Sequence, residues 1–582
     1  MHDIMELRLT SRTIILLLIL TVLMVYYPAL FAPLIGVDDL KMYHYLHNSD
    51  DINLRSLFFP GGSGTYYRPL LTASFLLDKY AWGLEESFMH LQNIILHLCN
   101  ALLVYAITRR SFLFLDVVSP VPAFLAALFF AVHPINTEAV NWVSGRTDLL
   151  AGFFILLSFM LVIKYPIPWS WSLLAAICLF LACLAKETAV FFLPAALFLP
   201  FFLSRVEGFK VYLGTFIGKN IFHFLFFILS VSGYFALRAL AFSASDDGVS
   251  RVVTHIAGGH SNGIMVSVRL ILKASGFYVK KLFIPFPLNF GITHVSDLYM
   301  IVGAALFVVM ALFLVRRKLS DYFFLAAFSI GSSALMIPLL GVTWTPLAER
   351  YMYIPSAFFL GGLTLAAYPK FRNCRHEKIL QTCFAALALV AIFGTVSRTL
   401  LWQDNLLLFQ DTVRKSPDFL PAQNEYAIAL YAAGRKDEAN AHINSLQVPD
   451  DLINYQYGLV NKAYARVQSD DYEGARRLLR KALENPGKHE VMILQRLLKL
   501  NEVQIKNGKA QAGAFYSDDV QFLERLYEIT RDSFYQYRIG QTHMFKGDRA
   551  KAGKAFQCVV AHAPENVYYL SAARKLLQKM SE

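Results

Sequence analysis

The first two thirds of the chain alternate between long apolar stretches and short polar turns. A helix that crosses a bilayer needs about 20 mostly apolar residues. Stretches of about this length are 13–35, 88–108, 121–140, 147–164, 171–186, 187–204, 220–241, 298–315, 321–341, 349–369 and 377–400. They predict an all-α, polytopic membrane bundle of about 11 spans. The stretch 263–285 is also apolar but contains several basic residues, so we expect an amphipathic helix along the outer surface, with a twelfth span as the alternative.

Basic residues fall in alternate loops of this layout, as the positive-inside rule requires when the N-terminus is inside. These residues are Arg8, Arg12, Arg109, Arg110, Lys164, Arg205, Lys210, Lys219, Arg316, Arg317, Lys318, Lys370, Arg372, Arg375 and Lys378. The alternation holds when 263–285 does not cross. An odd number of spans then places the C-terminal part outside, on the same side as the loop 36–87.

The composition agrees with a membrane protein. Of the 582 residues, 56% are hydrophobic and 16% are charged, whereas soluble domains are about 25% charged. The net charge of +12 would raise nucleic acid as a partner for a soluble protein. Here the basic residues are concentrated in short loops, so membrane orientation explains the charge and we expect no nucleic-acid partner. The first apolar run is too long for a signal-peptide core, and we expect it to be retained as a span.

From about Ser416 the chain is polar, with a helical pattern. The segment Gly434–Ala439 recurs as Gly547–Ala552, and Asp470–Ala475 has the same spacing. Ala439 and Ala475 are 36 residues apart, close to the 34-residue tetratricopeptide period. Glycine allows a tight turn between helices, and a small alanine lets paired helices approach. We predict three or four degenerate tetratricopeptide-like repeats over 403–582, with an ordinary helical domain as the alternative.

Polar side chains gather at the turns that should face outside, while the span interiors are nearly uncharged. Asp38 and Asp39 follow the first span, and Arg68 lies in a Tyr-Tyr-Arg-Pro turn. The other outer polar residues are His90, Asn93, His97, His133, Asn136, Glu138, Asn141, Arg146, Asp148, Lys186, Glu187, Glu349, Arg350 and Tyr351. Because polar groups at membrane depth are costly and usually face a cavity, we expect one polar site at the outer leaflet.

Each of these features has a plain structural alternative. The Asp38–Asp39 pair can simply be solvated, and the arginines can extend to lipid headgroups. Lys186 and Glu187 can neutralise each other at a helix end. His90, Asn93 and His97 lie at i, i+3 and i+7 on one helix face, where they can bond to other helices. His133 and Glu138 are metal-ligand types, but their set is incomplete and we expect no metal.

In this order, the segments resemble the transmembrane and tetratricopeptide-repeat O-mannosyltransferase family and its bacterial relatives, which belong to the GT-C superfamily of membrane glycosyltransferases. The resemblance is carried by Val37–Asp39, Tyr67–Leu70, His90–Asn93 with His97, Val132–Asp148, Ala185–Glu187, Glu349–Pro355 and Trp402–Pro417. It implies a GT-C-type membrane domain over 1–402, with catalytic acids in the outer loop 36–87, followed by a tetratricopeptide-like domain over 403–582. The repeat tail of this chain is short and degenerate.

The resemblance implies transfer of one sugar from a polyprenyl-phosphate-linked donor to a hydroxyl acceptor, such as Ser or Thr of a protein, with inversion and without a cofactor. Asp38 would be the base, with Asp39 second. A carboxylate suits the base, and fixed cations suit the leaving phosphate. The cations would be Arg68, Arg146, Lys186 and Arg350. Residues that would position the substrates are Tyr67, His90, Asn93, His133, Glu138, Asp148, Glu187 and Tyr351.

Two other functions fit the same sequence. One is a membrane-anchored repeat scaffold without catalysis, although an anchor needs only one span. The other is a lipid or solute transporter, although transporter sites usually lie near the midplane and these charges lie on one side. The absence of an N-x-S/T sequon favours a bacterial inner membrane, with the site and the repeats in the periplasm; in a eukaryote the membrane would be the endoplasmic reticulum. We expect the repeats to hold an extended acceptor polypeptide near the base.

Overall fold

The computed structural model describes residues 10–36, 38–47, 54–60, 66–164, 166–204, 220–241, 264–340, 345, 347–371, 377–446, 452–486, 489–563 and 567–581. Arg8, the basic loop at 205–219, the basic residues at 372–375 and parts of the outer loop 36–87 lie outside these described residues. The chain separates into two compact units. The first holds most of the described residues up to Ser416, and the second holds those from Pro417 onward together with the short helix α3 (Leu54–Phe58) and residues 238–241 at the end of α13.

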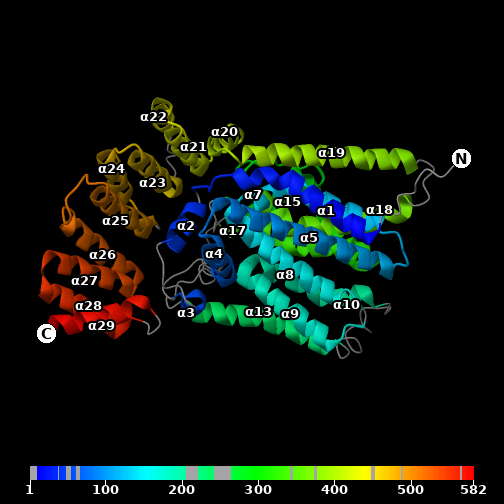
Figure 1. The fold of residues 1–582 in the computed structure, drawn as a ribbon, viewed down its shortest axis with the longest axis horizontal. Helices are drawn as coiled ribbons and strands as arrows, with labels where there is room; N and C mark the ends of the chain where they lie inside the picture. The colour runs from blue at the N-terminus through cyan, green and yellow to red at the C-terminus, as the bar shows by residue number, and fades with distance from the viewer. Residues whose placement is uncertain are drawn as a thin grey trace. The chain divides into compact units, whose positions relative to one another are not determined.

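The first unit is built from helices, as predicted (Figure 1). Its α-helices are α1 (Ser11–Tyr26), α2 (Asp39–His47), α4 (Pro69–Trp82), α5 (Glu86–Phe114), α6 (Val121–Ala131), α7 (Thr137–Asn141), α8 (Arg146–Val162), α9 (Trp169–Ala185), α10 (Leu193–Leu203), α13 (Ile221–Ala241), α15 (Ile264–Phe283), α16 (Tyr299–Arg316), α17 (Leu319–Leu340), α18 (Tyr353–Phe371), α19 (Glu377–Leu401) and α20 (Asn405–Lys415). Short 3-10 helices are η1 (Tyr27–Phe31), η2 (Pro134–Asn136), η3 (Val143–Gly145), η4 (Glu187–Phe192) and η6 (Glu349–Met352). The described residues contain no strand; Ile292 and Leu347 form an isolated β-bridge.

Seven helices of the described chain are long and apolar enough to cross a membrane. They are Ser11–Phe31, Glu86–Phe114, Val143–Val162, Ile221–Ala241, Tyr299–Arg316, Leu319–Met336 and Thr382–Leu401. An eighth is formed if Val121–Ala131 and Pro134–Asn141, which meet at a bend of 46°, make one span. Each of the predicted stretches contains a helix, but α9, the η4–α10 segment and α18 are not among the candidate spans. The chain is therefore an integral membrane protein with several spans.

Polar residues inside the long helices point into the bundle, where they find partners. On α5, His97 contacts the Tyr353 hydroxyl at 2.9 Å and the Ala131 carbonyl at 3.0 Å. Asn100, one turn further, donates to the Leu149 carbonyl at 3.0 Å. Hydrogen bonds of this kind join membrane helices, because an unsatisfied polar group is costly where water is absent. Of the residues His90, Asn93 and His97, His97 thus bonds to other helices, as the structural alternative in the sequence analysis states.

α15 packs backbone against backbone with α16. A Cβ atom added at Gly276 would lie 1.9 Å from the carbonyl oxygen of Tyr299, and one added at Gly303 would lie 2.0 Å from that of Leu272. Only glycine permits helices to approach this closely, as at many membrane-helix interfaces. α15 is not among the candidate spans, and its position along the membrane surface stays a prediction.

The two units divide after Ser416 because α20 is bound to the first unit. Arg398 of α19 pairs with Asp411 of α20 at 2.7 Å. Lys415, at the end of α20, donates to the Leu288 carbonyl at 2.7 Å. These contacts fix the last helix of the first unit just before the polar tail begins.

The second unit is a succession of helices that pack on their neighbours in the chain. They are α21 (Leu420–Ala432), α22 (Lys436–Ser445), α23 (Leu452–Gln468), α24 (Tyr472–Glu484), α25 (Glu490–Lys506), α26 (Tyr516–Thr530), α27 (Ser533–Lys546), α28 (Arg549–His562) and α29 (Tyr568–Ser581). The recurring segments of the sequence fall at three tight turns, which end α21, α23 and α27. The connection between α25 and α26 is longer and contains none of these recurring segments.

The three turns share the backbone geometry that their sequences predict. Gly434, Asp470 and Gly547 all have positive φ, at +77°, +59° and +85°. Five residues later in each copy, the alanine is completely buried between the paired helices. A left-handed residue closes each hairpin, and the small side chain lets the next helix approach. The helical hairpins are present, and their assignment as tetratricopeptide repeats remains a prediction.

Candidate functional site

Asp39 is a buried carboxylate that joins two segments far apart in the chain. It lies in the first turn of α2 and is 2% exposed. Its oxygens accept from the Ile35 N–H at 3.2 Å, from the Ser144 N–H at 2.9 Å and from the Ser144 hydroxyl. Burial raises the pKa of Asp39 to about 6, even though the bonds from Ser144 and Ile35 favour the charged form. This residue holds η3 against the end of the first helix.

Asp38 differs from its neighbour in its exposure and in its hydrogen bonds. Its side chain is half-exposed, and among the described residues it has no ion pair or side-chain hydrogen bond. Asp38 is also within electrostatic reach of the Tyr66 phenol. A carboxylate with free lone pairs can accept a proton from a bound hydroxyl, whereas that of Asp39 is already occupied. Of the two acids, the geometry therefore favours Asp38 as a base.

Arg68 is held in place by a carboxylate and an aromatic ring. It forms two parallel bonds to Glu187, from Nε to Oε2 at 2.8 Å and from the terminal nitrogen to Oε1 at 2.5 Å. Its guanidinium lies 4.3 Å from the centroid of the Tyr66 ring. The two bonds use two of its five N–H groups, and its side chain is 21% exposed. Arg68 can thus bind an additional anion without leaving Glu187.

Tyr66 is a residue of this site that the sequence analysis missed. We predicted a role for Tyr67, but Tyr67 is 2% exposed and packs near the ring of Tyr234. Tyr66 is 46% exposed and lies within electrostatic reach of Asp38, Arg68, Glu187 and Tyr351. Alternate residues of an extended segment point the same way, so a site that contains Arg68 should also contain residue 66. The two-residue spacing between Tyr66 and Arg68 was therefore the sequence signal that could have identified Tyr66.

Two further ion pairs lie beside this group. Lys186 donates to Asp148 at 2.6 Å, and its ammonium lies 5.6 Å from the centroid of the Tyr351 ring. Arg350 pairs with Glu138, whose other oxygen accepts the backbone N–H groups of residues 349 and 350 at 3.0 and 3.1 Å. All four charged side chains are less than 9% exposed. Glu138 therefore fixes the start of η6, and with it the position of Tyr351.

A fourth pair, Lys281–Glu349, completes the group and was not assigned a role from the sequence. Lys281 donates to Glu349 at 2.6 Å and to the Pro285 carbonyl at 2.9 Å. Glu349 also accepts the Asn289 N–H at 3.0 Å. The pair was hard to foresee because Lys281 ends a helix that we expected at the membrane surface.

Arg146, by contrast, is completely enclosed. It pairs with Asp78 at 2.5 Å and donates to the Asn93 side chain and the Met89 carbonyl at 2.9 and 2.8 Å. Its guanidinium lies over the ring of Phe75. Both members of the ion pair are 0% exposed, so this geometry favours a structural role for Arg146. Asn93 has the same character, since it also donates to the Trp142 carbonyl at 2.9 Å.

The two histidines assigned as positioning residues are also buried. His133 precedes η2, where it accepts the Ile135 N–H at 3.2 Å, and its other ring nitrogen contacts the Leu282 carbonyl at 3.1 Å. His90 is 1% exposed on α5. Within the described part of the chain, no three His, Cys, Asp or Glu side chains are grouped so that they could hold a metal ion.

The structure therefore brings most of the predicted residues into one connected network of alternating charge. Arg68 interacts electrostatically with Asp148, and Arg350 interacts with both Glu138 and Asp148. The buried pairs hold each other in place, and Asp38, Tyr66 and Arg68 form the accessible part. Chemically, the arrangement offers a proton acceptor and a fixed cation that both interact with Tyr66, and both lie outside the candidate spans.

Comparison with known proteins gives a consistent relationship over part of the chain. No protein-family model matches. Protein O-mannosyl-transferase TMTC2 of Mus musculus is 37% identical over 142 residues, which are 23% of this chain and 16% of that protein. The chain is similar to protein O-mannosyl-transferases. TMTC1 of Homo sapiens is 41% identical over 95 residues, 16% of this chain and 10% of that O-mannosyl-transferase. Tmtc1 of Drosophila melanogaster is 36% identical over 131 residues, 22% and 15% of the two chains.

The aligned segments thus span less than a fifth of the length of these O-mannosyl-transferases. Among solved structures, the oligosaccharyltransferase of Archaeoglobus fulgidus, tethered to an acceptor peptide, matches with a TM-score of 0.38 and 16% identity. The match covers 72% of this chain and 59% of that one. A score at this level does not establish a shared fold.

Proposed function

We propose that this protein is a membrane glycosyltransferase that moves one sugar from a polyprenyl-phosphate-linked donor to the hydroxyl of a Ser or Thr in a protein. The observation that carries the proposal is the accessible group of Asp38, Tyr66 and Arg68, in which Glu187 and the Tyr66 ring hold Arg68 in place. The name of the matched relatives, protein O-mannosyl-transferase, supports the same class of reaction and makes mannose the first sugar to test.

The proposed reaction is a single displacement. The acceptor oxygen forms its bond to the anomeric carbon as the bond from that carbon to the phosphate oxygen breaks. The proton of the acceptor hydroxyl passes to the Asp38 carboxylate. The phosphate leaves on its lipid with the additional negative charge. Attack on one face and departure from the other inverts the anomeric centre.

Arg68 is the cation we assign to the leaving phosphate. Preorganised cations stabilise charge that develops in a transition state, and they need no reorganisation when they are already held in place. Arg68 is held by Glu187 and still has N–H groups to donate. Lys186 and Arg350 are less than 9% exposed and paired with buried carboxylates. We therefore assign them a structural role, in which they hold the residues of the site in place without contacting the substrate. Tyr66 would contact the sugar or the acceptor.

The site would face the periplasm of a bacterium, or the lumen of the endoplasmic reticulum in a eukaryote. No cofactor or metal enters the proposed reaction, because the side chains named above supply both the base and the phosphate-binding charge. Asp39 acts through η3 and is a positioning residue in this scheme.

The transfer itself can be tested with purified protein in lipid nanodiscs. Polyprenyl-phosphate mannose labelled in the sugar is supplied with a Ser/Thr-rich acceptor peptide, and label in the peptide is measured over time. We expect transfer that saturates with donor and an inverted linkage in the product. Absence of transfer with mannose, glucose and N-acetylglucosamine donors alike would refute the proposal. Movement of an intact labelled lipid or sugar across the bilayer, without transfer, would favour a transporter.

A further inference from the structure

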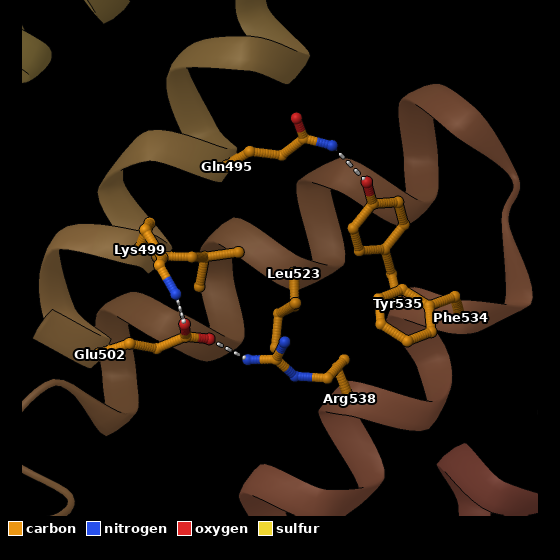
Figure 2. Close-up of a pocket in the computed structure, with 8 residues that line it drawn as sticks. Gln495, Lys499, Glu502, Leu523, Phe534, Tyr535 and Arg538 are labelled. Carbon is orange, nitrogen blue, oxygen red and sulfur yellow. Dashed lines mark hydrogen bonds and ion pairs between the residues drawn. The ribbon is translucent and has the colours of Figure 1, made fainter. Parts of the chain in front are cut away.

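A hollow of about 230 Å³ lies in the second unit, between α25, α26 and α27 (Figure 2). Pockets for drug-sized ligands are about 300–1,000 Å³, so this one matches one or two amino-acid side chains better than a cofactor or a sugar nucleotide. It lies in the array of helical hairpins of the second unit, and none of its lining residues belongs to the proposed catalytic site.

The floor of the hollow is apolar. Leu498 of α25 and Leu523 of α26 are 8% and 1% exposed and belong to the core of the second unit. Phe534, at the start of α27, is half-buried and lines the same space. A large apolar side chain placed here would be removed from water against three apolar side chains.

The rim of the hollow is positively charged in excess. Lys499 and Arg538, from α25 and α27, both donate to Glu502, at 3.2 and 2.8 Å (Figure 2). The lining thus contains two cations and one carboxylate. Asp519 also interacts with Arg538, but it is bound to Asn501 at 2.7 Å and does not line the hollow. A ligand carboxylate would complete this group, whereas a ligand cation would compete with Lys499 and Arg538 for Glu502.

The other end of the hollow can bind a peptide unit. The amide nitrogen of Gln495 donates to the Tyr535 hydroxyl at 2.9 Å. This bond leaves the amide oxygen of Gln495 to accept and the Tyr535 O–H to donate, which matches the N–H and C=O of a polypeptide backbone. Residues 495 and 502 are two turns apart on α25, and 535 and 538 are one turn apart on α27, so the two ends are about 5–10 Å apart. Two or three extended residues span this distance.

We propose that the hollow docks an extended polypeptide segment in which a large apolar side chain is adjacent to a carboxylate. The apolar side chain fills the floor, the carboxylate meets Arg538 and Lys499, and the backbone meets Gln495 and Tyr535. The inference deepens the proposed function, on which its biological meaning rests, because the docked segment would belong to the acceptor protein. Extended surfaces of helical repeats bind polypeptides in the same general way.

The test is a binding measurement without any sugar donor. The full-length protein in nanodiscs is titrated into a fluorescein-labelled nonapeptide of Ser, Thr and Gly with a central Phe-Asp pair, and anisotropy is recorded. Two matched peptides replace the Phe by Ala or the Asp by Lys. We expect saturable binding of the Phe-Asp peptide and at least about tenfold weaker binding of both matched peptides. Equal binding of the three peptides, or no binding of any, would overturn the inference.

Three variants locate the binding. Arg538→Gln should weaken the Phe-Asp peptide about fivefold or more, and Lys499→Glu, at a side chain that is 66% exposed, should shift the preference toward the lysine peptide. Arg525→Gln is the matched control, because Arg525 also pairs between helices, with Glu490 at 2.7 Å, but lies outside the hollow. Equal loss in Arg525→Gln and Arg538→Gln would place the binding elsewhere and refute the site. Selective peptide binding without sugar transfer would refute only the proposed function, and transfer without this selectivity would refute only the docking site.

Discussion

Replacing Asp39 by alanine should destabilise the first unit, because this buried carboxylate accepts hydrogen bonds from two separate segments. Ile35 and Ser144 each donate a backbone N–H to it. A buried donor left without an acceptor costs about 1–3 kcal/mol, so two of them predict a loss of roughly 2–6 kcal/mol in Asp39→Ala. Asp39→Asn keeps one acceptor oxygen and nearly the same size, and it should lose about 1 kcal/mol.

The same residue gives a pH dependence with a definite sign. Burial raises the pKa of Asp39 from 3.8 to about 6. A carboxyl group whose pKa is raised by folding favours the folded state when it is protonated. Its contribution is complete below about pH 3.8 and is lost as the pH rises through 6. Linkage then predicts that Asp39 stabilises the fold by about 1 kcal/mol more at pH 5 than at pH 7.

The assay is thermal unfolding in nanodiscs, followed by the fluorescence of the six tryptophans at a single scan rate. The scan rate is fixed because membrane proteins often unfold irreversibly. The stability of the wild type relative to Asp39→Asn should increase as the pH is lowered from 7 to 5. Asp38→Ala is the control, since its half-exposed carboxylate has no partner among the described residues. If Asp39→Ala unfolded at the wild-type temperature, or if Asp38→Ala lost as much, the positioning role of Asp39 would be refuted.

Three other substitutions have expected outcomes. Arg146→Ala leaves Asp78 charged and unpaired in the bundle and should cost about 3–5 kcal/mol, measured as a lower unfolding midpoint; a wild-type midpoint would show that the pair is not structural. Gly303→Ala would place a methyl group 2.0 Å from the Leu272 carbonyl oxygen and should separate α15 from α16. We expect a lower unfolding midpoint and faster hydrogen exchange in residues 264–283. Unchanged hydrogen exchange would contradict the close packing. Arg68→Lys keeps the charge but loses the two parallel bonds to Glu187, so kcat/KM for sugar transfer should fall about 10–100-fold. Arg68→Gln also loses the charge, and its kcat/KM should fall further. Equal rates in the wild type and Arg68→Gln would show that Arg68 does not bind the phosphate.

The helical architecture was predictable because apolar stretches and turn residues act locally. The predicted spans coincide with helices, and the turns at Gly434, Asp470 and Gly547 have the backbone geometry that their spacing indicates. The number of full spans was less predictable. α9 is 17 residues long and η4–α10 begins with a 3-10 turn, so hydropathy alone made each resemble a crossing helix.

The sequence could not predict which polar residues are buried structural partners and which are accessible to a substrate. Asp38 and Asp39 are adjacent and chemically identical, and only the position of η3 makes one a buried acceptor and leaves the other accessible. Arg68 and Arg146 likewise differ through their surroundings, since Arg146 is enclosed by α4 and α5. Partners such as Lys281–Glu349 join residues 68 positions apart, and such long-range pairing leaves no local pattern.

The central claim is that the half-exposed acid Asp38 accepts the proton of the acceptor hydroxyl. Its most direct test is the initial rate of sugar transfer, at saturating donor and acceptor, in Asp38→Asn compared with the wild type. A general base contributes about 10²–10⁴-fold, so we predict that Asp38→Asn retains the fold and donor binding and loses at least about 100-fold in rate. The loss of a general base should lower the rate far more than about threefold. A rate for Asp38→Asn within about threefold of the wild type would therefore contradict this role of Asp38.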